Sequence, residues 1–114
     1  MDVWQAAIEL AKDVYARTKD YPRDEIFGLV SQMRRCAVSI ASNIAEGAAR
    51  NGKREFLQFL YIALGSVSEL DTQIEISKAT RITTEATLDK LQRDTTRVKM
   101  MLLGLIRSLK ARDS

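Results

Sequence analysis

The residues best suited to chemistry lie in one short stretch, SIASNIAEGAARNGKREF, at positions 39–56. At about 100° per residue, a polar thread runs along this helical pattern. The thread, with one arginine that precedes the stretch, comprises Arg35, Ser39, Ser42, Asn43 and Glu46. It could be a ligand site, a solvated face, or a surface that specifies packing between helices or subunits. Packing is favoured, because small serines allow close approach and an asparagine near a core commonly fixes register and partner choice.

The composition argues against catalysis. The chain has no histidine, which removes the commonest general base and transition-metal ligand. Ser-His-Asp and Cys-His catalysis are therefore excluded, and the Glu-x-x-His metal sites of helical bundles are excluded with them. No glycine-rich phosphate loop is present either. We expect no enzymatic activity, no metal and no cofactor.

The single cysteine, Cys36, is the remaining candidate nucleophile. It follows Arg34 and Arg35 in the segment MRRCAVS, and nearby cations can lower the pKa of a thiol. Cys36 also lies beside an apolar stripe, where a small cysteine packs as a hydrophobe. The second interpretation is favoured.

Basic residues suggest contact with phosphate. Arg50, Lys53 and Arg54 lie at a junction between two apolar stripes, with only Glu46 and Glu55 close enough to pair with them. A surplus of donors at a loop suits phosphate contacts, whereas solubilising charge is the ordinary role of such a cluster. These three residues are therefore candidate nucleic-acid ligands.

A second basic group, Lys90, Arg93 and Arg97, shares one helix face. Asp89 and Asp94 interleave with it and weaken it. No aromatic stacking platform accompanies either group, so readout of single-stranded bases is not expected. Both groups remain candidates for contact with an RNA or DNA backbone.

Length and charge bound the class of protein. The chain of 114 residues suits a single domain, residues 1–114. Its formal net charge of +3 allows nucleic acid as a partner without requiring it. One cysteine, no signal pattern at the N-terminus and no apolar run approaching the about 20 residues that span a bilayer predict a soluble, cytoplasmic protein.

Apolar periodicity predicts four helices, at residues 3–20, 24–49, 52–80 and 84–112. The first has Trp4, Ala7, Ile8, Ala11, Val14 and Tyr15 on its apolar face. The second has Ile26, Leu29, Val30, Met33, Ala37, Ile40, Ala41 and Ile44. The third has Phe56, Leu60, Ala63, Val67, Leu70 and Ile74. The fourth has Leu88, Leu91, Thr95, Val98, Leu102, Leu105 and Leu109.

Short connections between these helices predict an all-α fold, an antiparallel up-down-up-down four-helix bundle. The first helix is the shortest, so three helices or a neighbouring subunit would cover part of the bundle. Further apolar residues lie outside the core register, namely Leu57, Tyr61, Leu64, Met100, Leu103 and Ile106. They either widen the core stripe or form an oligomer interface, and self-association is favoured because large exposed apolar patches usually mark interfaces.

Three segments carry a family resemblance: DVWQAAIELAKDVY, YPRDEIFGLVSQMRRCAVSIASNIAEG and REFLQFLYIALGSVSELDTQ. Over residues 2–75 they resemble the four-helix-bundle proteins of the 23S rRNA intervening-sequence type, with SNIAEG as the most recognisable phrase. The resemblance implies a closed bundle, often a ring of five subunits, with no known enzymatic activity. The chain departs from the family pattern at Cys36, where alanine is common, at Ala41, where proline is common, and at Ala48, where an aromatic often stands.

A more distant similarity is to the accessory protein of diversity-generating retroelements, a basic pentameric barrel that binds nucleic acid and a reverse transcriptase. Together these resemblances imply a homo-oligomer, a pentamer first of all, that acts as a scaffold for RNA or DNA. The alternative is a protein-interaction adaptor that does not bind nucleic acid and whose basic residues meet an acidic protein.

Overall fold

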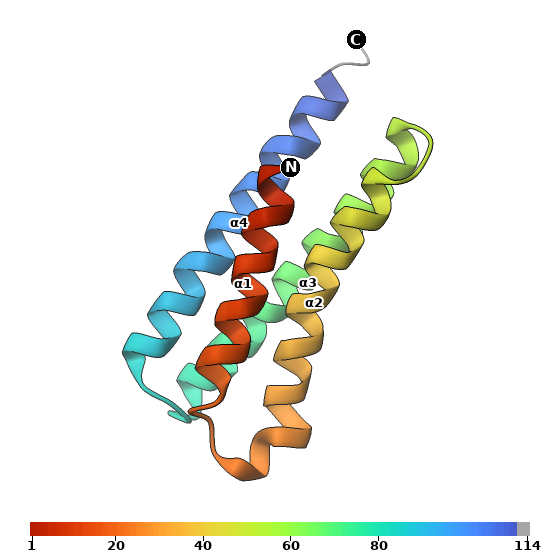
Figure 1. The fold of residues 1–114 in the computed structure, drawn as a ribbon. Coiled ribbons are helices and arrows are strands. Elements are labelled where there is room, and N and C mark those ends of the chain that lie inside the picture. Colours follow the sequence, from red (N-terminus) through yellow and green to blue (C-terminus); the bar gives the residue numbers. More distant parts are fainter. Residues whose placement is uncertain (112–114) are drawn as a thin grey trace.

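The four apolar stripes become four helices that run alternately up and down (Figure 1). The computed structural model describes residues 1–111. Its elements are α1 (Asp2–Thr18), η1 (Arg23–Glu25), η2 (Ile26–Val30), α2 (Ser31–Ala48), α3 (Lys53–Ala79) and α4 (Glu85–Ala111). The predicted all-α four-helix fold is confirmed. Residue 112, the predicted end of the last helix, lies outside the described residues.

Among the helix ends that fall within residues 1–111, the predicted ones lie within two residues of the observed ones, except at the start of α2. Residues 23–30 form a 3-10 turn followed by a wide π turn, and regular α-helix begins only at Ser31. The carboxylate of Glu25 accepts a hydrogen bond from the Leu29 amide at 3.2 Å. Gly28 leaves helical geometry with φ −108° and ψ −112°. Residues 23–30 are therefore helical in part, but they do not extend the regular α-helix α2.

The core lies along the bundle axis and takes side chains from all four helices. The predicted stripes on α3 and α4 are buried, with Leu60, Leu70 and Leu102 fully enclosed. Burying each such leucine contributes roughly 1.5–3 kcal/mol relative to exposing it. Leu105 and Phe56 are exceptions, since both are only partly buried at the edge of the core.

The prediction for α1 is confirmed for Ala7 and Val14 and wrong for its three largest side chains. Trp4, Ile8 and Tyr15 are 39%, 43% and 44% exposed, and the buried face consists of Val3, Ala6, Ala7, Leu10, Val14 and Thr18. Two stripes, each with helical spacing, lie about 100° apart on this helix. Periodicity alone cannot choose between them. The bundle buries the stripe rich in alanine and turns the larger side chains toward α2.

Ile26 is a second correction, because it is 48% exposed although the sequence places it on the core stripe of α2. It lies in the π turn, before the regular helix begins. A helical projection that starts at residue 24 therefore assigns it the wrong direction.

Buried hydroxyl groups are paired within the bundle. Thr18, Ser77 and Thr95 each donate to the carbonyl four residues earlier, at 2.6, 2.9 and 2.6 Å. The Tyr21 hydroxyl then donates to Ser77 Oγ at 2.7 Å and ties the α1–α2 connection to the end of α3. Such pairing is needed, since an unpaired buried hydroxyl costs about 1–3 kcal/mol.

The shortness of α1 leaves one end of the bundle to three helices. With 17 residues against 27 in α4, α1 is shorter by roughly 15 Å at 1.5 Å per residue. It begins well below the C-terminal turns of α4 (Figure 1). The end at which α2 passes into α3 is therefore built from α2, α3 and α4. No helix within residues 1–111 combines the length and the apolar character required to cross a bilayer.

Candidate functional site

The corner between α2 and α3 is shaped by two glycines. A Cβ on Gly47 would lie 2.7 Å from the Cβ of Phe59, so this glycine allows α2 and α3 to approach closely just before the corner. Gly52 has φ +122°, a left-handed conformation that side chains rarely adopt, and it directly precedes α3. The corner is therefore tight, and α3 begins abruptly at Lys53.

Three cations crowd this corner. Arg50 forms an ion pair with Glu46 at 2.8 Å, and its guanidinium lies 5.1 Å from the centre of the Phe59 ring. Arg54 is exposed in the first turn of α3. Because Gly52 has no side chain to cap the helix, the first amides of α3 add their partial positive charge to the same place.

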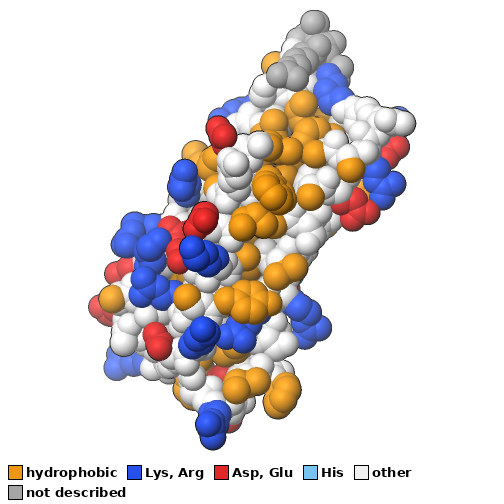
Figure 2. Space-filling model, in the orientation of Figure 1, with side chains coloured by type: hydrophobic (Ala, Val, Ile, Leu, Met, Phe, Trp, Pro, Cys, Tyr) orange, Lys and Arg blue, Asp and Glu red, His pale blue; other side chains and the backbone are white. Residues whose placement is uncertain are grey.

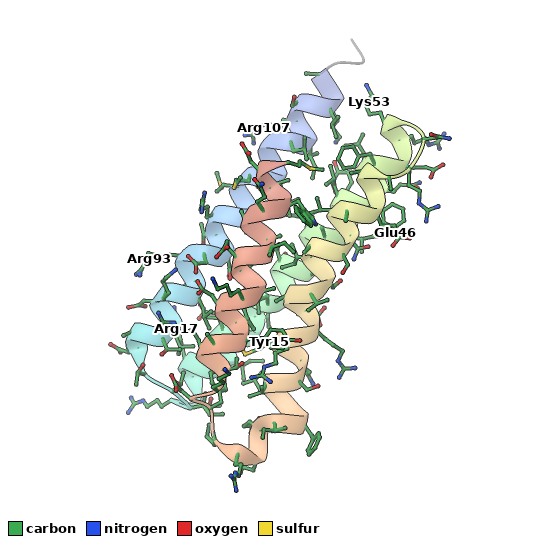
Figure 3. The ribbon with its side chains drawn as sticks, viewed as in Figure 1. Tyr15, Arg17, Glu46, Lys53, Arg93 and Arg107 are labelled. Carbon is green, nitrogen blue, oxygen red and sulfur yellow. The ribbon has the colours of Figure 1, made fainter. Side chains whose placement is uncertain are left out.

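Two cations missed by the sequence analysis lie toward the same end. Arg107 and Lys110 are exposed on the last turns of α4, and Lys110 Nζ lies 5.3 Å from the centre of the Tyr61 ring on α3. Lys53 and Arg107 both lie toward this end (Figure 3). Residues 95–111 contain four cations and no acid. This excess of positive charge is the sequence feature that could have identified Arg107 and Lys110 as candidates. We call Arg50, Lys53, Arg54, Arg107 and Lys110 the basic end.

The second predicted basic group does not join the basic end. Lys90 Nζ bonds to Asp13 Oδ2 at 3.0 Å and to Asp94 Oδ2 at 2.7 Å, and it ties α4 to α1. The hydrogen bond to Asp94, more than any other contact, raises the pKa of Lys90. Arg93 and Arg97 remain exposed along a shallow hollow of α4, and Arg93 lies toward the opposite end from Lys53 (Figure 3).

Part of the polar thread, Ser39 with Asn43 beside it, lies at the contact between α2 and α3. Ser39 Oγ is 3.0 Å from Ser66 Oγ across the two helices. The Asn43 amide donates to the carbonyl and the hydroxyl of Ser39 at 2.8 and 3.1 Å. Arg35 donates to Ser31 on its own helix at 3.3 Å, and Ser42 is exposed. Ser39 and Asn43 thus serve contacts within one chain, whereas Arg35 and Ser42 face outward.

Cys36 is enclosed beside this thread. Its thiol donates to the Ser66 carbonyl at 2.9 Å, and it is 4% exposed. Burial, with a smaller effect from Glu69, raises the pKa of the thiol to about 12. The neighbouring Arg34 does not oppose this, because it lies over the Tyr15 ring and donates to Thr18. The thiol is protonated near neutral pH and is not an activated nucleophile.

The predicted oligomer-interface residues are divided between surface and core. Tyr61 and Met100 are 44% and 56% exposed, and Leu57, Leu64 and Leu103 are partly buried. Ile106 is 4% exposed and belongs to the core of the single chain, which corrects its assignment to an interface. Positions 105 and 106 follow Leu102 by three and four residues, and both spacings are helical. In the structure Ile106 is buried in the core and Leu105 is only partly buried.

Comparison with known proteins gives a family and a fold. The family model described as 23S rRNA-intervening sequence protein matches residues 1–104. A crystal structure from Bacteroides thetaiotaomicron, a protein of unknown function from the S23 ribosomal protein family, is similar with a TM-score of 0.83 and 24% sequence identity. The match covers 92% of this chain and 95% of that chain. No curated protein matches the sequence.

Proposed function

Because the chain belongs to the 23S rRNA-intervening sequence protein family, we propose that it is a non-enzymatic, cytoplasmic, homo-oligomeric scaffold that binds RNA or DNA. The observation that carries this proposal is the basic end. Five cations from the α2–α3 connection, α3 and α4 lie there, together with the first amides of α3, which have no side-chain cap. In the described segments that form this end, 46–59 and 100–111, the acidic side chains are Glu46 and Glu55, so positive charge is in excess.

The chemistry of the basic end fits phosphate groups. Guanidinium groups bind phosphate oxygens in a bidentate manner, and helix amides prefer anions. Phe59 lies beneath the Arg50 guanidinium, 5.1 Å from it, which favours contact with the backbone rather than stacking with bases. We therefore expect binding with little sequence preference.

Self-association would strengthen these contacts. One subunit offers few phosphate ligands, whereas a closed ring repeats the basic end and raises avidity through effective concentration. The exposed Tyr61 and Met100 on one face of the bundle support self-association, and the family resemblance favours a homopentamer. Light scattering should give five times the subunit mass of 12.9 kDa. A subunit mass at every concentration up to 100 µM would refute self-association.

The binding test uses fluorescence anisotropy with labelled RNA and DNA, single- and double-stranded, over a range of salt concentrations. The Arg50→Ala/Arg54→Ala variant removes two cations from the basic end, and Arg93→Ala/Arg97→Ala removes two from the other group as a matched control. The measured quantity is the slope of the logarithm of the binding constant against the logarithm of the salt concentration. We expect the first pair to reduce the magnitude of this slope by about 0.7–0.9 per lost phosphate contact, and we expect the control pair to leave the slope unchanged. Equal weakening by both pairs would refute a specific role for the basic end.

The same measurement tests the adaptor alternative. If the wild-type oligomer does not bind any of the four nucleic acids at low salt, the scaffold proposal fails. The basic end would then be interpreted as a binding surface for an acidic protein. In that case an acidic polypeptide, but not nucleic acid, should bind in a manner that depends on Arg50 and Arg54.

A further inference from the structure

Two apolar faces of the bundle lack a cover within the described chain. One face, which we call the ridge, lies on α3 and α4 and consists of Leu57, Tyr61, Leu64, Met100 and Leu103. The other, which we call the seam, lies between α1 and α2 and consists of Trp4, Ile8, Tyr15, Ile26, Phe27 and Val38, all exposed. Phe27 is 97% exposed. Figure 2 shows apolar side chains gathered over α1 and α2 on the seam side.

The seam and the ridge lie on opposite sides of the molecule. Side-chain contacts join each helix to the next in chain order and join α4 back to α1. These contacts are Arg34 with Tyr15, Ser39 with Ser66, Gln92 with Glu75, and Lys90 with Asp13. The α1–α2 and α3–α4 pairs are therefore opposite edges of a square. A subunit with two different apolar faces on opposite edges is suited to head-to-tail association, which closes into a ring when the rotation allows it.

The two faces also complement each other in shape. On α2, Ala41, Ala45 and Ala48 continue the helix face of Val38; Ala45 and Ala48 are exposed and Ala41 is buried, and these small side chains leave room for larger ones. Below them Tyr15 and Phe27 line a hollow of about 400 Å³. The ridge presents Tyr61 and Met100, which project from α3 and α4. The large side chains of the ridge can therefore pack over the small alanines of α2.

The heights of the two faces along the bundle match as well. Ser39 lies opposite Ser66, and Gly47 opposite Phe59, so positions on antiparallel α2 and α3 correspond in height. The alanines of the seam are consequently level with Leu57 and Leu64 of the ridge. Subunits related by rotation about an axis parallel to the bundle meet at equal heights, so apolar residues would meet apolar residues.

Two residues of opposite charge, Arg35 and Asp71, also lie at the same height along the bundle. Arg35, at the rim of the hollow, is exposed and lies one turn before Ser39, level with Asp71 on α3. Asp71 follows Leu57 and Leu64 at intervals of seven and therefore lies on the ridge side of α3. Its Oδ1 atom is buried without a hydrogen-bond partner among the described residues. The carboxylate therefore carries a charge that the described chain does not pair at this oxygen, and a guanidinium from a neighbouring subunit would meet that charge from outside.

We infer that the seam of one subunit receives the ridge of the next, with Arg35 of one facing Asp71 of the other. This inference rests on the proposed self-association and adds which surfaces pair and in which direction. It also implies that Trp4, Ile8 and Val38, exposed in the single chain, are buried in the assembly.

The test mixes two variants that each lose one face. Ile8→Glu/Val38→Glu disables the seam and Tyr61→Glu/Met100→Glu disables the ridge, and circular dichroism confirms that both remain helical. Each variant alone should be a monomer by light scattering. An equimolar mixture should form a heterodimer of twice the subunit mass, because one intact seam and one intact ridge remain. Dimers of either variant alone, or a mixture that stays monomeric, would overturn the inference.

A charge exchange tests the register. Arg35→Asp and Asp71→Arg should each weaken assembly at least about tenfold, because like charges would then meet at every junction. The double variant in one chain should regain most of the lost affinity, which a purely structural role of either residue would not produce. Failure of rescue overturns the Arg35–Asp71 pairing. A wild-type protein that is monomeric refutes the proposed self-association itself, whereas wild-type oligomers without heterodimers refute only the pairing of faces.

Discussion

Gly47, the last residue of the SNIAEG phrase, provides the most direct test of how α2 and α3 pack. A Cβ at this position would meet Phe59 Cβ at 2.7 Å, Phe56 Cδ1 at 3.1 Å and the Phe56 carbonyl oxygen at 3.3 Å. The nearest of these atoms is fixed by the backbone of α3, so a rotamer change cannot relieve the overlap. Gly47→Ala must push the two helices apart or bend one of them.

Two opposing contributions set the magnitude. In a helix interior, alanine is favoured over glycine by about 0.5–1 kcal/mol. Overpacking a tight contact costs about 1–3 kcal/mol. Gly47→Ala should therefore lower the free energy of unfolding by about 0.5–2 kcal/mol, and the melting temperature by about 4 °C for each kcal/mol.

Gly65 and Gly104 supply matched controls, because a Cβ at either helical position meets no atom within 4 Å. Gly65→Ala and Gly104→Ala should each raise the free energy of unfolding by about 0.5–1 kcal/mol. Urea denaturation at one protein concentration, with the oligomeric mass checked for each variant, measures all three. The reasoning is refuted if Gly47→Ala is as stable as the control variants.

Three further predictions concern single side chains. Because burial raises the pKa of Cys36 to about 12, a thiol reagent at pH 8 should modify the native protein far more slowly than the urea-unfolded chain, and equal rates would contradict the enclosure. Tyr21→Phe removes the donor to Ser77 and should lower the free energy of unfolding by about 0.5–1.5 kcal/mol, measured in urea. Lys90→Met should be less stable than wild type at neutral pH; since the folded-state pKa of Lys90 is raised above 10.5, that difference should persist from neutral pH up to pH 10.5 and shrink as the pH rises through the raised value. A difference independent of pH would contradict the ion pairs.

The sequence was sufficient for the fold because three of the four helices carry one dominant apolar stripe. It was insufficient for α1, where the 3-7-10-14 and 4-8-11-15 stripes are both apolar and only tertiary packing decides between them. The same ambiguity explains why Leu105 was assigned to the core and Ile106 to an interface, whereas Ile106 is the buried residue. In the π turn, hydrogen bonding by Glu25 and the backbone of Gly28 override the helical pattern that places Ile26 inward.

The candidate site was predicted in part for a related reason. Arg50, Lys53 and Arg54 are neighbours in sequence, so their gathering could be foreseen. Lys90 was expected to be available for a ligand, but its partner Asp13 lies 77 residues away in the chain. Arg107 and Lys110 join the basic end only because α4 returns to the corner between α2 and α3, which sequence spacing does not reveal.

The short α1 has a consequence for local unfolding. Where only α2, α3 and α4 pack together, each helix buries less of its surface, and such regions open with lower free energy than a four-sided core. Backbone amides in the last turn of α2 and the first turns of α3 should therefore exchange hydrogen for deuterium faster than those near Ile40 and Leu70. The basic end lies in this region, so a bound polyanion should slow exchange there most.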